Sequence, residues 1–256
     1  MLLNPNMRKT GIGRLETIPV WSRYFGSWCF SISRRPFAAN ELEGHYDKAS
    51  DRWHTTISKL GFEAAYADLI DQAQPELSKT DPDARLKVLD AGIGTGAFAV
   101  AFASRCLRPI DLTGLDVSSE MLRQAKNNLN SFATNATFYK GDINDLPFAD
   151  HTFDVVLVAH VIEHMAEPEV ALAELSRVLK PGGFLVACIT QRSSAGAYIQ
   201  LKWRTHRVDE YTATGWFHRS GLSSVRAIKL KDGSTAQRFS TGYVAVKTPE
   251  FASEVL

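Results

Sequence analysis

The sequence predicts a protein of the α/β class, in which helices cover both faces of a parallel sheet. Two observations carry this prediction. Short apolar runs, typical of buried strands, alternate with helical patterns from residue 86 to residue 190. Such alternation is typical of parallel strands joined by helical crossovers. The chain has 256 residues, of which 45% are hydrophobic, so it can form one good-sized domain with a substantial core of its own.

The first helical pattern lies before the sheet. Apolar side chains recur at three- and four-residue steps over residues 41–73, with Gly61 as a break. We assign a helical lid to residues 41–80, and a turn follows at residues 81–83.

Five strand-like runs follow, at residues 86–89, 112–115, 137–139, 153–158 and 183–189. Helices are expected between them. One covers residues 97–103, a second is capped by Ser118, and a third begins at Pro168 and stops at residues 181–183. Parallel sheets bind ligands beyond the carboxyl ends of their strands. This places the candidate site at residues 90–96, 116–121, 141–143 and 159–164.

Composition excludes several classes of protein. With 29 basic and 28 acidic residues, the chain is not a globally basic nucleic-acid binder. No apolar run approaches the length of a membrane-spanning helix. The three cysteines have no disulfide or zinc spacing, which indicates a reducing cytosol. We therefore expect a cytoplasmic protein without a nucleic-acid partner.

Residues 1–38 differ from the rest, since they carry six basic side chains, one acidic side chain and several aromatics. No apolar segment with a cleavage site follows the charges, so we do not predict a secretory signal. We assign residues 1–40 to a basic, aromatic arm. Two interpretations stay open for it: packing on the domain through its aromatics, or contact with a membrane surface.

The loop after the first buried strand matches a dinucleotide fingerprint. Residues 92–97 read GIGTGA, and the acidic Asp116 follows 20 residues after Gly96. However, Asp90 would place a carboxylate beside the pyrophosphate of a dinucleotide. A ligand that carries an ammonium group and no phosphate would instead be attracted by this carboxylate. S-adenosylmethionine is such a ligand.

Five motifs then resemble class I S-adenosylmethionine-dependent methyltransferases of the small-molecule type. They are Val88–Gly96 (VLDAGIGTG), Leu115–Ser118 with Met121-Leu122, Gly141–Ile143 with Leu146–Phe148, Phe153–Val156 with Ile162–His164, and Leu175–Gly183 (LSRVLKPGG). The resemblance covers about residues 86–190. It implies a Rossmann-like, mostly parallel seven-stranded sheet over residues 81–256, with S-adenosylmethionine as the cofactor.

The resemblance also assigns cofactor contacts. Gly92 and Gly94 let the methionine tail approach closely, and Asp90 lies near its ammonium. Asp116 accepts the ribose hydroxyls. The whole expected set is Asp90, Gly92, Gly94, Gly96, Asp116, Val117, Met121, Asp142, Ile143 and Ala159. Within it, Met121 and Ile143 sandwich the adenine while Asp142 accepts from its amine.

Methyl transfer depends mainly on the alignment of the acceptor atom, the methyl group and the sulfur. A general base is needed only where the acceptor loses a proton. His160 and His164 are the candidate bases, four residues apart on a predicted helical turn. Tyr46, in the lid, resembles a tyrosine that covers the cofactor in this family. No HExxH pattern or third ligand supports a metal site, so we expect none.

The substrate pocket is expected after residue 190, where this family usually varies. Residues 191–256 carry ten basic and five acidic residues, and Tyr198, Trp203 and His206 are the candidate contacts. The last strands, 224–230 and 243–247, fit the family's terminal hairpin. An anionic or aromatic acceptor suits this composition.

The predicted function is methyl transfer to oxygen, nitrogen or carbon of a small molecule. A lipid or quinone acceptor at a membrane would explain the N-terminal arm. Two further alternatives stay open, namely use of the cofactor for other chemistry and a scaffold role. Nicotinamide-dependent oxidoreduction is disfavoured by Asp90. The residues after the fourth strand, Ala159–Ile162, lack the Asn/Asp-Pro-Pro-Tyr/Phe pattern of amino-group methylation.

Overall fold

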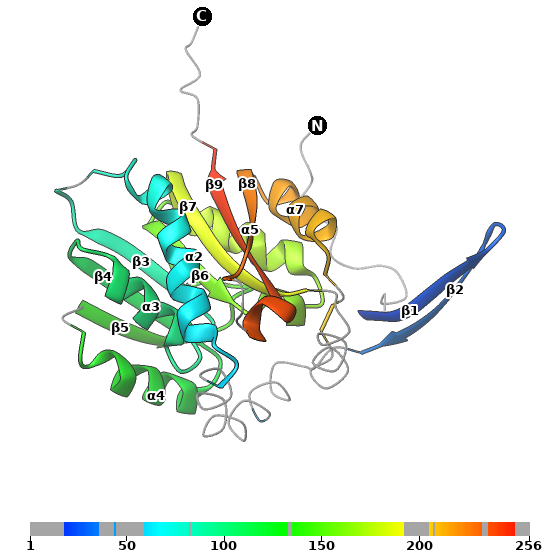
Figure 1. Cartoon of the computed structure of the whole chain (residues 1–256), viewed down its shortest axis with the longest axis horizontal. Helices are drawn as coiled ribbons and strands as arrows, with labels where there is room; N and C mark the ends of the chain where they lie inside the picture. The colour runs from blue at the N-terminus through cyan, green and yellow to red at the C-terminus, as the bar shows by residue number, and fades with distance from the viewer. Residues whose placement is uncertain are drawn as a thin grey trace, which may run out of the picture.

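The computed structural model describes residues 18–35, 44, 59–81, 83–132, 135–191, 205–206, 208–231 and 235–248. Its main body is a seven-stranded sheet with the strand order β5-β4-β3-β6-β7-β9-β8, covered by helices on both faces (Figure 1). The predicted α/β class and the mostly parallel seven-stranded sheet are confirmed.

The five predicted strands are all present: β3 (Leu86–Ala91), β4 (Ile110–Asp116), β5 (Asn135–Lys140), β6 (Phe153–Ala159) and β7 (Leu179–Thr190). Neighbours among these five pair in parallel. The terminal hairpin is formed by β8 (Leu222–Lys229) and β9 (Ser240–Lys247), and β9 is antiparallel to both β7 and β8.

Two helical layers enclose the sheet. One contains α2 (Phe62–Leu77), α3 (Ala97–Arg105) and α4 (Ser119–Leu129), and the other contains α5 (Pro168–Val178) and α7 (Glu210–Arg219). The described part of this body also contains two short 3-10 helices, η1 (Ile162–His164) and η2 (Thr235–Arg238). Successive strand residues point to opposite faces, so Val88 packs with the first layer and Leu89 with the second.

Helix ends follow signals in the sequence. The Ser118 side chain accepts a hydrogen bond from the Met121 N–H and caps α4, as predicted. Gly61, the predicted break, has φ 77° directly before α2. Most of the lid before it, residues 45–58, lies outside the described residues, so the 41–80 unit stays a prediction.

The helix predicted to stop at residues 181–183 ends earlier. Helix α5 ends at Val178, and Lys180–Gly183 belongs to β7. The pairing of β6 with β7 jumps from Phe153↔Leu179 to Val155↔Phe184. The extra residues form a bulge, with Gly182 at φ 78°.

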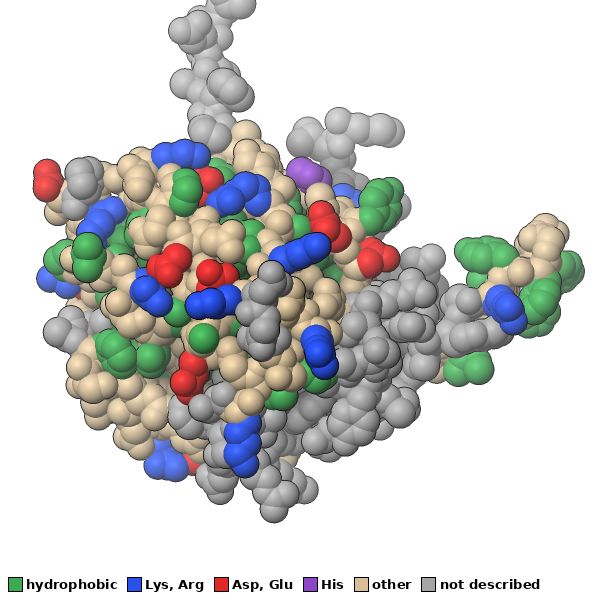
Figure 2. Space-filling view, in the orientation of Figure 1, with side chains coloured by type: hydrophobic (Ala, Val, Ile, Leu, Met, Phe, Trp, Pro, Cys, Tyr) green, Lys and Arg blue, Asp and Glu red, His purple; other side chains and the backbone are tan. Residues whose placement is uncertain are grey.

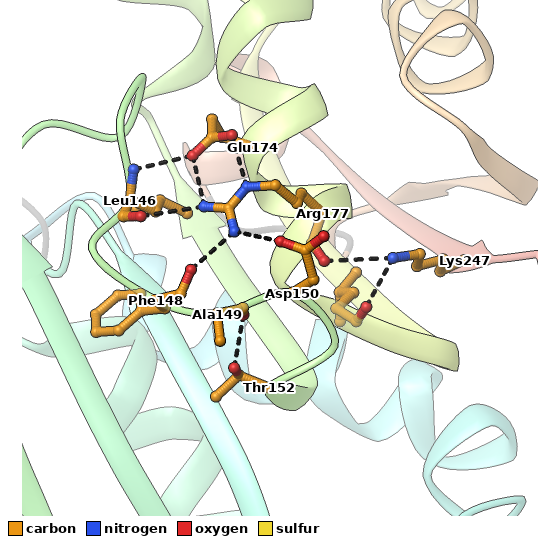
Figure 3. Close-up of polar contacts among 9 residues, drawn as sticks. Leu146, Phe148, Ala149, Asp150, Thr152, Glu174, Arg177 and Lys247 are labelled. Atoms are coloured by element: carbon orange, nitrogen blue, oxygen red, sulfur yellow. Dashed lines mark hydrogen bonds and ion pairs between the residues drawn. The ribbon is translucent and has the colours of Figure 1, made fainter.

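The loop between β5 and β6 is fastened to α5 by Arg177 (Figure 3). Its guanidinium donates to the Glu174 carboxylate at 2.8 Å, to Asp150 at 2.7 Å, and to two loop carbonyls, those of Leu146 and Phe148. Glu174 in turn accepts from the Leu146 N–H at 3.0 Å. Because this loop begins with residues 141–143, the clamp fixes one wall of the expected ligand site.

The described part of the N-terminal arm is a β-hairpin, which the sequence analysis did not predict. Strand β1 (Ile18–Phe25) pairs antiparallel with β2 (Trp28–Arg34). The hairpin projects away from the sheet and its helices (Figure 1). No described helix is both long enough and apolar enough to span a membrane.

Candidate functional site

The strand order brings the predicted loops together. Strand β3 has β4 on one side and β6 on the other, so the chain reverses its direction of winding there. The carboxyl ends of β3 and β6 border a cavity of about 40 Å³. Its lining comes from α2, the loop after β3, the start of α3 and the end of β6: Tyr66, Asp90, Gly92, Ile93, Gly94, Thr95, Ala97, Phe98, Ala159 and His160. A space of this size admits a small polar group, and a larger ligand must extend beyond it.

Asp90 is the chemically unusual group in this lining. Its side chain is 1% exposed, and its Oδ2 atom has no hydrogen-bond partner. Burial raises its pKa to about 8, although a hydrogen bond from the Ala99 N–H lowers it, and the nearby Asp116 raises it further. An ammonium group beside Oδ2 would supply the missing partner and the missing positive charge.

The glycines of the loop have different roles. Gly92 and Gly94 adopt φ 73° and 53°, which disfavour residues with a Cβ. A Cβ at Gly92 would lie 2.4 Å from Val161 Cγ2, whereas a Cβ at Gly94 would enter open space. Gly96 faces α4, where a Cβ would lie 3.3 Å from the Ala125 Cα, and it does not line the cavity. Gly94 is therefore the glycine beside which a ligand has room.

Asp116 ends β4 and is held in place by two backbone donors. Its Oδ2 accepts from the Gly94 N–H and its Oδ1 from the Ser118 N–H, both at 2.9 Å. The side chain is 8% exposed. Two backbone donors therefore orient the Asp116 carboxylate at the carboxyl end of β4.

The next strand end lies directly beside Asp116. The Gly141 N–H donates to the Asp116 carbonyl at 3.0 Å, which brings the predicted adenine contacts to the same edge. Ile143 and Met121 are buried at 4% and 1% exposure. Asp142 is exposed and accepts from the backbone and side-chain nitrogens of Asn144 at 2.9 Å. Val117 is half-buried, and the role predicted for each of these residues stays a prediction.

The helical turn predicted for His160 and His164 is wrong. His160 has φ 57° and lies before η1, which contains only His164 of the two. Both ring nitrogens of His160 contact protein atoms. Its Nδ1 lies 3.2 Å from Thr190 Oγ1 and 3.4 Å from Glu163 Oε1, and its Nε2 lies 3.6 Å from Cys188 Sγ.

This environment also keeps His160 charged. Burial alone would lower its pKa, but Cys188 and Glu163 beside the ring raise it to about 10. A protonated ring cannot accept a proton at neutral pH. The general-base role of His160 stays a prediction, and its contacts with Glu163 and Thr190 also suit a positioning role.

Glu163 is the functional candidate that the sequence analysis missed. It is fully buried, and its Oε1 accepts from the Thr190 N–H at 2.8 Å. Burial would raise its pKa, but the hydrogen bond and charge of His160 lower it to about 2. The available signal was an acidic residue directly after the apolar pair Val161-Ile162, in the fourth motif.

Tyr66 was predicted only as an apolar position of α2. It is 2% exposed and reaches the cavity beside Asp90 and His160. Its ring lies 4.7 Å from that of Phe98, so α2 closes one side of the cavity.

The remaining predicted residues are only partly described. Tyr46, Tyr198 and Trp203 lie outside the described residues. His206 donates its backbone N–H to the Glu163 carbonyl at 2.7 Å, and its Nε2 lies 2.9 Å from the Met165 carbonyl. These contacts fasten His206 to the loop after β6, and its substrate role stays a prediction. Among the described residues, no three His, Cys, Asp or Glu side chains are arranged to hold a metal ion.

Comparison with known proteins agrees with this geometry. Residues 89–187 match a family model described as a methyltransferase domain. The chain is 34% identical over 116 residues to a demethylmenaquinone methyltransferase of Staphylococcus aureus, an alignment that covers 45% of this chain and 48% of that protein. It is 35% identical over 102 residues to the ubiquinone/menaquinone biosynthesis C-methyltransferase UbiE of Geotalea daltonii, covering 39% and 43%. The alignments thus span just under half the length of these curated relatives.

Solved structures share the fold. Magnesium protoporphyrin IX methyltransferase from Synechocystis PCC 6803, with bound S-adenosylhomocysteine, superposes with a TM-score of 0.64 at 17% identity. The superposition covers 82% of this chain and 99% of that chain. At this identity the similarity establishes the fold, and the site has to be argued from this chain's own residues.

Proposed function

The chain carries a domain of the class I S-adenosylmethionine-dependent methyltransferase family, and we propose that it transfers a methyl group from S-adenosylmethionine to a small-molecule acceptor. One observation carries the proposal. The buried side chain of Asp90, whose Oδ2 has no hydrogen-bond partner, lines a cavity beside a glycine loop. A dinucleotide would place phosphate where this carboxylate lies, whereas the amino-acid tail of S-adenosylmethionine offers an ammonium.

The residues present fit the rest of the cofactor. Asp116, oriented by the N–H groups of Gly94 and Ser118, would accept the two ribose hydroxyls. Met121 and Ile143 would contact the two faces of the adenine, and Asp142 its exocyclic amine. Tyr66 and Phe98 would exclude water from the tail. Val117 and Ala159 complete the proposed set of contacts.

When bound, the cofactor supplies a methyl group on a sulfonium, which is already a good leaving group. With the cofactor bound, the acceptor's electron pair would form the new bond to the methyl carbon and the electrons of the broken bond would stay on sulfur. A ring carbon that is methylated would give up its proton to a base or to water. This chain's residues have to hold donor and acceptor in line and keep water out. The His160–Glu163–Thr190 contacts fix the loop after β6, which borders the same cavity.

For the acceptor we propose a hydroquinone ring. The two curated relatives are named for methylation of menaquinone and ubiquinone precursors, and the family-model match over residues 89–187 includes the candidate cofactor residues from Asp90 to Ala159. Carbon is the proposed acceptor atom, as in the relative named a C-methyltransferase. Oxygen and nitrogen acceptors are the alternatives to be separated by experiment.

The cofactor is tested first, by calorimetric titration of the purified protein with S-adenosylmethionine, S-adenosylhomocysteine and NADH. We expect binding of the first two and none of NADH. Binding of NADH alone would overturn the interpretation of Asp90.

The acceptor is tested with methyl-labelled cofactor and a reduced naphthoquinone, with a simple phenol and an amine as comparison acceptors. Label in the phenol or the amine but not in the naphthoquinone product would refute the hydroquinone proposal.

A further inference from the structure

The β1–β2 hairpin has two unlike faces. Residues that pair across an antiparallel ladder lie on the same face, and alternate residues lie on opposite faces. The register pairs Phe25 with Trp28 and Arg23 with Phe30, and Ile32 follows on the same side. We call these five residues the aromatic face. The opposite face carries Tyr24, Cys29 and Ser31.

The aromatic face lies open to solvent. Phe25, Trp28, Phe30 and Ile32 are 57%, 72%, 56% and 63% exposed. Figure 2 shows the hydrophobic side chains of the hairpin gathered at its outer end, away from the described body of the protein. Soluble proteins rarely expose a contiguous apolar patch without using it. An isolated two-stranded hairpin is also marginally stable in water, so a surface that covers this face would stabilise it.

The charge of the segment identifies the kind of surface. Residues 17–40 contain three arginines, Arg23, Arg34 and Arg35, and no acidic residue. Arg23 lies on the aromatic face itself, with its guanidinium carbon 6.0 Å from the centre of the Phe25 ring. Aromatic rings beside basic side chains match the interface of an anionic bilayer, where rings settle at the headgroups and cations meet lipid phosphates.

We propose that the hairpin docks the protein on an anionic lipid surface through the aromatic face. The hairpin lies in the headgroup layer and does not cross the bilayer, because the outer edges of a two-stranded hairpin leave backbone groups that need water or headgroups. This inference goes beyond the proposed function and can be tested without it. If both hold, docking brings the site to a lipid-soluble acceptor.

A second copy of the chain is the competing occupant of this face. Two aromatic faces packed around a twofold axis would present the same residues to one another. That arrangement would bring two copies of Arg23 into one apolar interface without an acidic residue from the hairpin to pair with them. The anionic bilayer supplies that negative charge, so the bilayer is favoured.

The test is cosedimentation of the full chain with vesicles of phosphatidylcholine alone and of phosphatidylcholine mixed with phosphatidylglycerol. We expect binding to the mixed vesicles that weakens with added salt. The double variant Trp28→Ser/Phe30→Ser is expected to bind at least about tenfold more weakly, since each ring loses apolar burial. Tyr211→Ser is the matched control, because Tyr211 in α7 is 90% exposed and lies outside the hairpin. Thermal unfolding of each variant confirms that the domain is folded.

Whether the hairpin itself lies at the bilayer is tested separately with brominated lipids, which quench tryptophan fluorescence at the membrane. Trp28→Phe should keep vesicle binding but lose part of the quenching. Equal vesicle binding by the double variant and the wild type would overturn the proposal, and so would no binding by the wild type. Self-association that depends on Trp28 and occurs without lipid, measured by sedimentation, would assign the face to a second copy instead. Failure of the cofactor titration would refute the proposed function while leaving the vesicle result unaffected.

Discussion

Replacing Asp90 by asparagine separates two effects of the same carboxyl group, one on stability and one on cofactor binding. Burial raises its pKa from an ordinary value of 3.8 to about 8. Between these two values the folded protein holds a proton that the unfolded chain has lost. The folded state is therefore penalised as the pH rises, and the penalty is complete above about pH 8.

The size of the penalty follows from the shift. One pKa unit corresponds to about 1.4 kcal/mol, so the roughly three units between 3.8 and neutral pH cost about 4 kcal/mol. Asparagine is neutral throughout, but its amide donors enter a site that lacks acceptors for them, which costs about 1–3 kcal/mol. We expect Asp90→Asn to stabilise the cofactor-free protein at neutral pH by about 1–3 kcal/mol. The gain should shrink as the pH falls towards 4, because the penalty on the wild-type fold is lost as the pH approaches the unfolded pKa of 3.8.

Cofactor binding should change in the opposite direction. An ammonium binds the ionised form of Asp90, so wild-type affinity should rise by up to about tenfold per pH unit below pH 8, with release of a proton. Asp90→Asn should lose about 1.5–3 kcal/mol of binding free energy and this part of the pH dependence. Urea unfolding measures stability at each pH. Calorimetry in buffers of different ionisation enthalpy measures the affinity and the proton released.

Asp71→Asn is the control, since it removes an exposed carboxylate of α2 that does not line the cavity. A stability difference between wild type and Asp90→Asn that does not change with pH would refute the assigned burial cost. Unchanged affinity in Asp90→Asn would show that Asp90 does not receive the ammonium.

Four further variants test the candidate cofactor site and the loop that Arg177 holds. Asp116→Ala should weaken cofactor binding by about 1.5–3 kcal/mol, measured by calorimetry, because the ribose loses a charged acceptor. Gly92→Ala should destabilise the fold by about 1–3 kcal/mol in urea unfolding, since its Cβ would lie 2.4 Å from a valine side chain. Gly94→Ala has open space for its Cβ, so it should cost only about 1–2 kcal/mol of backbone strain while lowering cofactor affinity. Arg177→Met should cost about 1–3 kcal/mol of stability and speed amide exchange in residues 142–152, because the loop loses its clamp.

Each of these has an outcome that contradicts it. Wild-type affinity in Asp116→Ala would remove the ribose role, and wild-type affinity in Gly94→Ala would show that the ligand does not pass there. Arg123→Met controls for the clamp, since Arg123 pairs with Glu120 on the exposed surface of α4 and should contribute less than about 1 kcal/mol. Equal losses at Arg177 and Arg123 would mean that the loop does not depend on Arg177.

The strands and most helices could be predicted because their signals are local. Apolar runs in the sequence indicate β3, β4 and β6. Ser118 indicates the start of α4, because its side chain accepts a hydrogen bond from the backbone N–H three residues later. The convergence of Asp90 and Asp116 at one edge followed from a general rule of parallel sheets. The five-motif resemblance added the cofactor, which periodicity alone could not identify.

What could not be predicted depends on long-range contacts. His160 adopts a left-handed conformation beside Thr190, 30 residues away, and no local pattern specifies this. The bulge at Lys180–Gly183 arises from pairing with β6, whereas the same letters in isolation indicate a turn. The hairpin in the arm was obscured by its composition, because its aromatics suggested packing while the structure leaves them exposed.

Glu163 and Asp90 are both buried carboxylates with one oxygen that has no hydrogen-bond partner, but their charges are balanced differently. Glu163 has the charge of His160 and a backbone donor beside it, which lower its pKa. Asp90 has the Ala99 N–H on one side and the negative Asp116 nearby, and its pKa is raised. A neutral asparagine at position 90 would cost the cofactor-free fold less free energy than the buried carboxylate does, so the stability of the fold does not explain the carboxylate. A carboxylate that raises the free energy of the cofactor-free fold is explained by a cationic ligand that binds it.

The same reasoning predicts the behaviour of S-adenosylhomocysteine, which keeps the ammonium and lacks the sulfonium. Asp90→Asn should lose as much affinity for S-adenosylhomocysteine as for the cofactor itself. A loss confined to S-adenosylmethionine would place Asp90 at the sulfonium instead of the amino-acid tail.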